Sequence, residues 1–285
     1  MKIFNKKYVS IIAGSALLLI ILFGGYDLKI SGYLYDPDSL LGIFLAGYGS
    51  YPIMLASSVA GIMLINSREK PDNFRLYYGI LVIVISYIYL IKSPMDHMEG
   101  YPLYISGIVA TILTFGSCYV TDKLTKDCDK HDLLKYSLII LVFAISELAI
   151  INLIKYSWPR MRYRTLVNTS EDYYRMWYQY GGDIRKRLLE IPLEEFKSFP
   201  SLHTANATAI FFLLPLSMAV PELNKYRQAF HILIPVWIFI TGVSRIVMGA
   251  HFFSDVLWGF TISYLLFALS CYLVRKRMPD IKENE

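Results

Sequence analysis

The residues best suited to chemistry lie in the stretch 244–255, which reads Ser-Arg-Ile-Val-Met-Gly-Ala-His-Phe-Phe-Ser-Asp between two apolar segments. Charges at membrane depth are costly, so Arg245, His251 and Asp255 are functional candidates. His251 and Asp255 are four residues apart, which places them on one face if this part is helical. The carboxylate would then hold one ring nitrogen and leave the other free for chemistry. Gly249 offers a break at which the chain can turn. The alternative is an ion pair at a helix end.

A second polar group follows an earlier apolar segment and reads Lys155-Tyr-Ser-Trp-Pro-Arg160-Met-Arg162-Tyr-Arg164. Four cations within ten residues form a local anion trap. Arginine forks bind phosphate oxygens in a bidentate manner, and lysine acts as a point charge. The alternative is a basic cluster beside the membrane that only contacts lipid headgroups.

A third group, Phe199-Pro-Ser-Leu-His-Thr204, opens another apolar segment. Ser201 is suited to cap a helix that starts here. The N–H groups of Leu202 and His203 would then point outward with the positive helix end, ready for an anion. A lone histidine at a helix start is more often an ordinary polar residue. Helix–helix hydrogen bonding is expected for the next polar residues, Asn206 and Thr208.

Composition indicates the kind of protein that carries these groups. The chain has 285 residues, of which 55% are hydrophobic, whereas soluble domains are nearer 45–50%. Eight segments approach the roughly 17–25 residues that cross a bilayer. We therefore predict an all-α, polytopic helical membrane protein with about eight spans, in which Tyr48–Pro52 is a kink. The segments are Tyr8–Gly25, Leu40–Ile65, Leu76–Ile91, Pro102–Val120, Leu133–Ile154, His203–Val220, Phe230–Val247 and Phe252–Val274.

The positions of lysine and arginine predict the orientation. Most of those in short loops lie on the side of the N-terminus, so both termini are expected in the cytoplasm of a multi-pass cell-membrane protein. The outward segment 155–202 nevertheless holds nine lysines and arginines. Because basic residues are disfavoured on this side, their presence needs an explanation. All three polar groups lie on this outward side. The net charge of +5 does not require nucleic acid, because most basic residues lie between spans. Structural thiols are expected for the cysteines: Cys118, Cys128 and Cys271.

The combined groups suit phosphoryl transfer, in which electrostatic stabilisation is most of the catalysis. We expect His251, oriented by Asp255, to attack phosphorus and His203 to protonate the departing oxygen. No carboxylate cluster suited to Mg²⁺ or Ca²⁺ is expected on this side, so we predict a reaction without metal or other cofactor. The remaining histidines receive no role: His97, His131 and His231.

The order of the groups resembles the three-part signature of the type 2 phosphatidic acid phosphatase family, which includes vanadium haloperoxidases. In the first motif, Lys-x6-Arg-Pro, Lys155 and Arg162 match and a tyrosine replaces proline. In the second, Pro-Ser-Gly-His, Leu202 replaces glycine. The third, Ser-Arg-x5-His-x3-Asp, is matched in full by Ser244, Arg245, His251 and Asp255. The resemblance covers about 133–274 and does not need the first four spans.

This resemblance implies a six-helix phosphatase core, a phosphohistidine at His251 and hydrolysis without metal. It implies phosphate binding by Lys155, Arg162, Ser201, Arg245 and the N–H of Leu202, to which the charge pattern adds Arg160. Leu202 narrows the approach and does not easily adopt positive φ. We divide the chain into N-terminal transmembrane helices (1–132), the phosphatase core (133–274) with its outward loop (155–202), and a cytoplasmic tail (275–285).

The sequence thus predicts an integral-membrane lipid phosphatase acting on a monophosphate or diphosphate lipid at the outer side. Phosphatidate, phosphatidylglycerophosphate and undecaprenyl diphosphate all remain open as substrates. The alternative is a non-catalytic lipid-phosphate binder, transporter or scaffold of the same fold. The aromatic stretch Tyr173–Tyr180 is expected to be an interfacial belt or a lid. The oligomeric state does not follow from the sequence.

Overall fold

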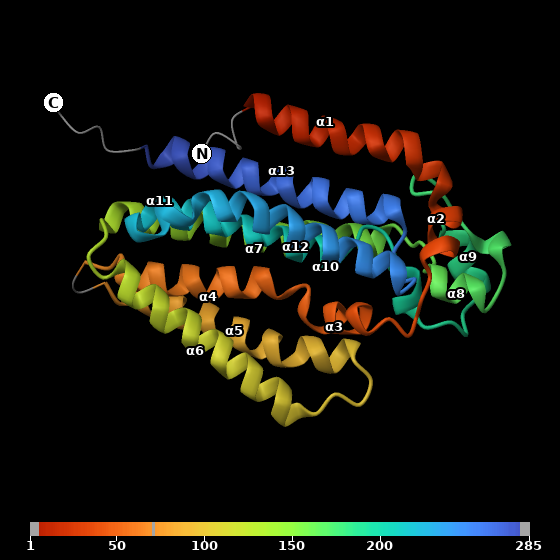
Figure 1. Cartoon of the computed structure of the whole chain (residues 1–285), viewed down its shortest axis with the longest axis horizontal. Coiled ribbons are helices and arrows are strands. Elements are labelled where there is room, and N and C mark those ends of the chain that lie inside the picture. Colours follow the sequence, from red (N-terminus) through yellow and green to blue (C-terminus); the bar gives the residue numbers. More distant parts are fainter. Residues whose placement is uncertain (1–5, 70–71, 280–285) are drawn as a thin grey trace.

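Helices account for nearly all regular structure in the described residues, 6–69 and 72–279, of the computed structural model (Figure 1). Side-chain caps start several of them, for example Ser39 before α3 and Asp129 before α7. The first helices are α1 (Lys6–Phe23), α2 (Asp27–Leu34), α3 (Leu40–Tyr48), α4 (Tyr51–Asn66), α5 (Asn73–His97) and α6 (Leu103–Thr125). The later ones are α7 (Lys130–Ser157), α8 (Tyr163–Val167), α9 (Gly182–Arg187), α10 (Leu202–Thr208), α11 (Leu213–Ala219), α12 (Arg227–Val247) and α13 (Phe253–Arg277).

Eight helical segments in the described ranges are long and apolar enough to cross a membrane. The all-α polytopic fold class is thus confirmed. The first segment continues through α2 to Leu34 and is longer than the apolar run alone indicates. The third, α5, has 25 residues, because polar and tyrosine-rich ends extend the short apolar core. The expected kink is present, since α3 ends at Tyr48 and α4 begins at Tyr51.

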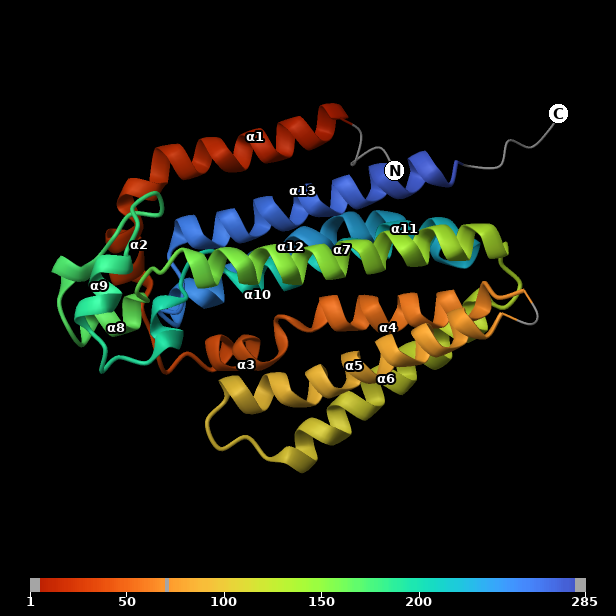
Figure 2. The same ribbon diagram turned by 180° about the vertical axis from the view of Figure 1, so that it is seen from behind.

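The helices form a bundle whose centre is α4, α7, the α10–α11 segment, α12 and α13 (Figures 1 and 2). Helix α1 lies along α13 at one edge, and the α5–α6 hairpin covers α4 at the other. In the apolar windows of α1 and α5, only 22% and 17% of the residues are buried, against 67% in the α3–α4 segment. The outer helices therefore face lipid, and the central helices face protein.

The central helices meet through aromatic and small residues. Phe143 of α7 contacts Phe267 of α13, with ring centroids 4.9 Å apart, and both side chains are fully buried. At the end of the bundle where α8 and α9 lie, α13 approaches α10 very closely. A Cβ atom added at Gly259 would lie 2.4 Å from the carbonyl oxygen of Ser201. Only glycine permits this contact, which fixes the start of α10 against α13.

The two ends of the long segment 155–202 are joined by backbone hydrogen bonds. The N–H of Arg160 donates to the carbonyl of Phe196 at 2.7 Å, and the N–H of Ser198 donates back to Arg160 at 3.0 Å. Below this pairing a small apolar cluster, which includes Met161, Leu166 and Phe252, supports the segment. The end of α7 and the start of α10 are therefore held side by side.

The close approach of α13 to α10 gives a test of the packing. Gly259→Ala is expected to lower the free energy of unfolding by about 1–3 kcal/mol, because the new methyl group overlaps Ser201. Thermal unfolding in detergent measures this loss. Gly116→Ala in α6 is the matched control, since nothing lies within 4 Å of the added atom. Equal melting temperatures for the two variants would contradict this description of the contact.

Candidate active site

The three polar groups predicted from the sequence converge at one end of the bundle, where α8 and α9 cover it (Figure 2). The end of α7 carries Lys155, the start of α10 carries His203, and the turn between α12 and α13 carries His251. The charges of Lys155 and Arg162 act on His251, as does that of His203. The charges of Arg245 and Lys155 also act on His203. Residues from widely separated segments thus share one electrostatic environment.

His251 lies in the turn and not in a helix, since α12 ends at Val247 and α13 begins at Phe253. Gly249 turns the chain with a φ of +60°. A Cβ atom there would lie 2.7 Å from the ring of Tyr35. The N–H of His251 returns to the carbonyl of Arg245 at 3.2 Å. The expected break at Gly249 is confirmed, and it folds His251 back towards the end of α12.

The ring of His251 is held by a backbone carbonyl. Its Nδ1 lies 2.5 Å from the carbonyl oxygen of Ser198. Because a carbonyl only accepts, Nδ1 must carry the proton, and Nε2 is left with its lone pair. The side chain is 3% exposed. Burial, followed by the charges of Lys155 and Arg162, holds the pKa of His251 well below its usual 6.5. The ring is therefore neutral at pH 7, and its Nε2 carries a free lone pair.

The expected direct contact between Asp255 and His251 is absent. Asp255 occupies the first turn of α13 and accepts the N–H of Phe252 at 3.0 Å, as helix-start carboxylates do. The same oxygen accepts the hydroxyl of Ser198 at 2.6 Å. Asp255 therefore acts on His251 only through Ser198. The prediction of a shared helix face was wrong because His251 lies before the helix starts.

Arg160 was predicted to bind phosphate, but the structure places its guanidinium elsewhere. The side chain is 1% exposed. One Nη atom donates to Asp255 at 2.5 Å and the other to Asp27 at 2.8 Å. The group also lies over the ring of Phe252, with Cζ 4.2 Å from the centroid. Two carboxylates neutralise this charge, so Arg160 is better described as a structural cation behind the site.

Lys155 and Arg245 are buried as well, but their hydrogen-bond partners are uncharged. The ammonium group of Lys155 donates to the carbonyls of Lys197 and Pro200 at 2.6 and 3.0 Å. Arg245 donates to the carbonyl of Gly42 at 2.7 Å. Carbonyl groups orient a cation without cancelling its charge. Among the described residues no carboxylate pairs with either side chain, so a bound anion would be their counter-charge.

Arg162 is a third cation near the site, and one of its N–H donors has no partner in the described ranges. Its Nη1 lies 3.5 Å from Glu195, whereas its buried Nε has no hydrogen-bond partner among the described residues. A buried unpaired donor next to other cations indicates space for an acceptor from a ligand. Glu195 also pairs with Arg164. One carboxylate thus serves two arginines, so their positive charges are only partly compensated. The site as a whole favours an anion with several oxygens.

The start of α10 forms as the sequence predicts. The hydroxyl of Ser201 caps the helix by accepting the N–H of Thr204 at 3.3 Å. Leu202 is the first residue of α10, in helical conformation, and no non-glycine residue in the described ranges has positive φ. The leucine therefore needs no strained backbone here. The first N–H groups of the helix, at Leu202 and His203, have no intrahelical acceptor.

His203 is held from outside the expected core. Its Nε2 lies 3.0 Å from the carbonyl of Ala46 in α3, so Nε2 carries a proton and Nδ1 is left for other contacts. The ring also packs edge-to-face against His97 of α5, with centroids 4.7 Å apart. His97 had been assigned no role, because a single histidine at a helix end carries no signal. The first four spans thus contribute to the surroundings of the site.

Two further predictions concern side chains around the site. Asn206 lies beside Tyr89 of α5, as expected for a helix–helix contact, whereas Thr208 bonds within its own helix. In the aromatic stretch, Trp177 packs on Trp258 with centroids 5.3 Å apart. The carbonyl of Trp177 accepts the indole N–H of Trp158 at 3.1 Å. This stretch is therefore anchored to α7 and α13.

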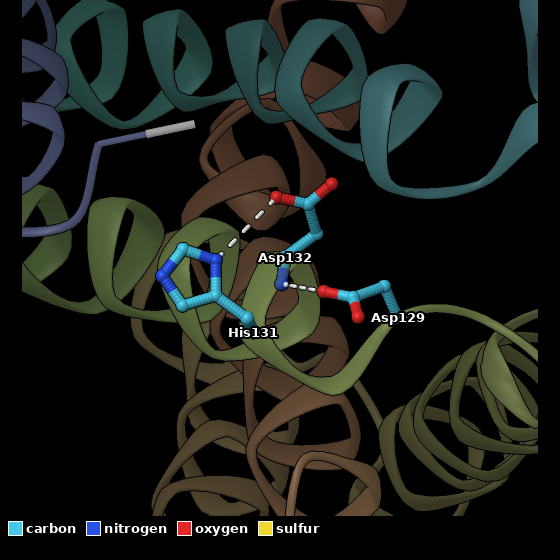
Figure 3. Close-up of side chains that lie close together, drawn as sticks. All are labelled: Asp129, His131 and Asp132. Carbon is cyan, nitrogen blue, oxygen red and sulfur yellow. Dashed lines mark hydrogen bonds and ion pairs between the residues drawn. The ribbon is translucent and has the colours of Figure 1, made fainter. Parts of the chain in front are cut away.

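A separate acidic group lies at the start of α7, at the other end of that helix from Lys155 (Figure 3). Asp129, His131 and Asp132 present ligand atoms within 4.8 Å of one another. Asp129 accepts the N–H of Asp132 at 2.9 Å, as a helix cap. The ammonium group of Lys135 contacts Asp132. Capping and this ion pair account for the arrangement without a metal ion.

Comparisons with known proteins agree with this picture. The family model described as the PAP2 superfamily matches residues 135–279, about half of the chain. Over 74 residues the chain is 36% identical to phosphatidylglycerophosphatase B of Bacillus subtilis (strain 168). That match covers 25% of this chain and 36% of the relative, so the chain spans only about a third of the relative's length. No solved structure matches.

The ion pairs of Glu195 give a pH-dependent prediction. Burial opposes its ionisation, but hydrogen bonds from Arg164 and Thr165 outweigh it and lower the pKa of Glu195 below 4.5. A lowered carboxyl pKa stabilises the fold above pH 4.5, and this contribution disappears as the pH falls through the folded-state value. Glu195→Gln should therefore lower the free energy of unfolding at pH 7 by about 1–3 kcal/mol, which appears as a lower melting temperature than that of wild type. The difference in stability between the variant and wild type should disappear in acid.

Melting curves in detergent from pH 7 to well below pH 4.5 would measure this effect. Glu190→Gln is the matched control, because Glu190 is exposed in the same loop. A pH-independent difference for Glu195→Gln would show that its charge is not what stabilises the loop.

Proposed function

Because the chain belongs to the PAP2 superfamily, we propose that it is a membrane lipid phosphatase that works through a phosphohistidine at His251. The observation that carries this proposal is the hydrogen bond from His251 Nδ1 to Ser198, at 2.5 Å. It leaves Nε2 neutral and unprotonated beside Lys155 and Arg162. A protein that only bound phosphate would need the cations but not this oriented base.

In the proposed reaction, the phosphate group lies among Lys155, Arg162 and Arg245. The N–H groups at the start of α10 supply further donors, and Ser201 orients that turn. Nε2 of His251 attacks phosphorus and forms a P–N bond as the P–O bond to the lipid breaks. His203 acts here with both ring nitrogens protonated: it gives the Nδ1 proton to the departing oxygen and keeps Nε2–H on the carbonyl of Ala46.

The second step regenerates the protein. Water attacks phosphorus, the P–N bond breaks, and the proton of the water passes to His203. Inorganic phosphate then leaves, and both histidines return to their starting states. The charge that develops on the phosphate oxygens meets cations already fixed by backbone carbonyls. Because these groups need no reorganisation, they stabilise the transition state effectively. The proposed reaction uses no metal.

The relative's name makes phosphatidylglycerophosphate the first substrate to test, followed by phosphatidate and undecaprenyl diphosphate. We propose that the site faces the outside of the cell membrane, as the distribution of lysine and arginine favours. The headgroup would reach the cations from the interface while its chain stays among the helices. The same fold without turnover, as a binder or transporter, is the alternative.

We predict that purified protein releases phosphate from at least one of these lipids in the presence of EDTA. His251→Ala should reduce turnover by at least about 1,000-fold, because it removes the nucleophile. His231→Ala, in α12 but 14 residues before Arg245, is the matched control and should keep full activity. A phosphorylated wild-type protein, stable in base and labile in acid, should be trapped during turnover.

Two results would reject this proposal. Absence of phosphate release from the whole lipid panel, with lipid phosphate still bound, would favour the binder. Turnover by His251→Ala at the wild-type rate would exclude the phosphohistidine even if the protein is a phosphatase.

A further inference from the structure

Asp27 is an ionisable residue that neither the predicted signature nor the family match at residues 135–279 includes. It begins α2 and is fully buried, with 0% exposure. It lies in the first membrane segment, Lys6–Leu34. A buried carboxylate in such a segment is costly unless it is paired, so its partners indicate its purpose.

The contacts of Asp27 lead to the start of α13. Its Oδ1 accepts the backbone N–H of Ser254 at 2.9 Å. Its Oδ2 accepts the hydroxyl of Ser254 at 2.5 Å and an Nη of Arg160 at 2.8 Å. Asp27 is therefore a helix cap supplied by a different helix. The positive end of α13 favours the carboxylate, and the guanidinium compensates its charge.

The same guanidinium extends the connection towards His251. The other Nη of Arg160 donates to Asp255 at 2.5 Å. Asp255 accepts the hydroxyl of Ser198 at 2.6 Å. The carbonyl of Ser198 accepts Nδ1–H of His251 at 2.5 Å. A series of hydrogen-bonded residues, which passes through the side chain and the backbone of Ser198, thus joins the first membrane segment to His251.

Arg160 would be less well fixed without Asp27. Its Nε donates to the carbonyl of Arg175 at 2.8 Å, and each Nη has its own carboxylate. Loss of one carboxylate leaves one Nη without a charged partner in a buried site and lets the guanidinium rotate towards Asp255. Asp255 would then be drawn away from Ser198, and the ring of His251 would lose its fixed orientation.

We propose that Asp27 is a positioning residue of the phosphatase site, which acts through Arg160, Asp255 and Ser198 to hold the ring of His251. This proposal rests on the proposed function, because it concerns the geometry of the same nucleophile. The first membrane segment is then part of the catalytic unit and more than an added anchor. Because Asp27 is proposed to act through other residues and not on the lipid itself, its substitution should lower kcat and leave lipid binding unchanged.

Asp27→Asn tests this role in the full-length protein, because asparagine keeps the size and removes the charge. For residues that orient a metal ligand through a hydrogen bond, loss of that bond typically costs about 10- to 100-fold in activity. We expect a fall of that order in kcat with little change in KM. The fall should also appear in the single-turnover rate constant at saturating protein, which does not depend on the fraction of inactive molecules. A merely structural role would reduce the active fraction and leave that rate constant unchanged.

Asp38→Asn is the matched control, since Asp38 is exposed in the loop after α2. It should behave as wild type. Ser254→Ala is the second test variant, because it keeps the backbone N–H for Asp27 but removes the hydroxyl. It should show a smaller fall in the same rate constant, and it decides the matter if Asp27→Asn does not fold.

The outcomes separate the two proposals. An active wild type whose Asp27→Asn and Ser254→Ala variants keep the wild-type single-turnover rate overturns the role of Asp27 alone. A wild type that hydrolyses no lipid phosphate overturns the proposed function, and the positioning role with it.

Discussion

The site depends on one buried guanidinium shared by two carboxylates. Arg160 joins Asp27 of the first segment to Asp255 of the last, and all three side chains are almost fully buried. Removing one member of such a group typically costs about 3–5 kcal/mol, because it leaves a charge uncompensated. The long loop that carries Arg160 and the start of α13 are therefore fixed to each other by electrostatics, and this also restrains His251, the proposed nucleophile.

The nature of the partner divides the cations at this end into two kinds. Arg160 and Arg164 form ion pairs with carboxylates, so their positive charge is compensated within the protein. Lys155 and Arg245 meet backbone carbonyls, which orient them and leave the charge in place. The carbonyl partner of Arg245 is Gly42 in α3, and that of His203 is Ala46 one turn later. A segment outside the family match therefore orients one cation and one histidine of the site.

Local patterns predicted much of this arrangement. Apolar runs gave the eight spans, and a serine before an apolar run gave the start of α10. The predicted contact between His251 and Asp255 was wrong because the four-residue spacing works only inside a helix, and the left-handed turn at Gly249 delays the start of the helix. Arg160 was misassigned because spacing gives the charge of a loop residue but not its direction. The pairing with Asp27 spans 133 positions, and nothing local encodes it.

The trans-capping of α13 by Asp27 has a consequence for biogenesis. Asp27 leaves the ribosome with the first segment, whereas Ser254 is made more than two hundred residues later. Until the final helix inserts, the carboxylate lacks the N–H and hydroxyl donors that it has in the finished fold. Assembly of the site is thus tied to completion of the polypeptide.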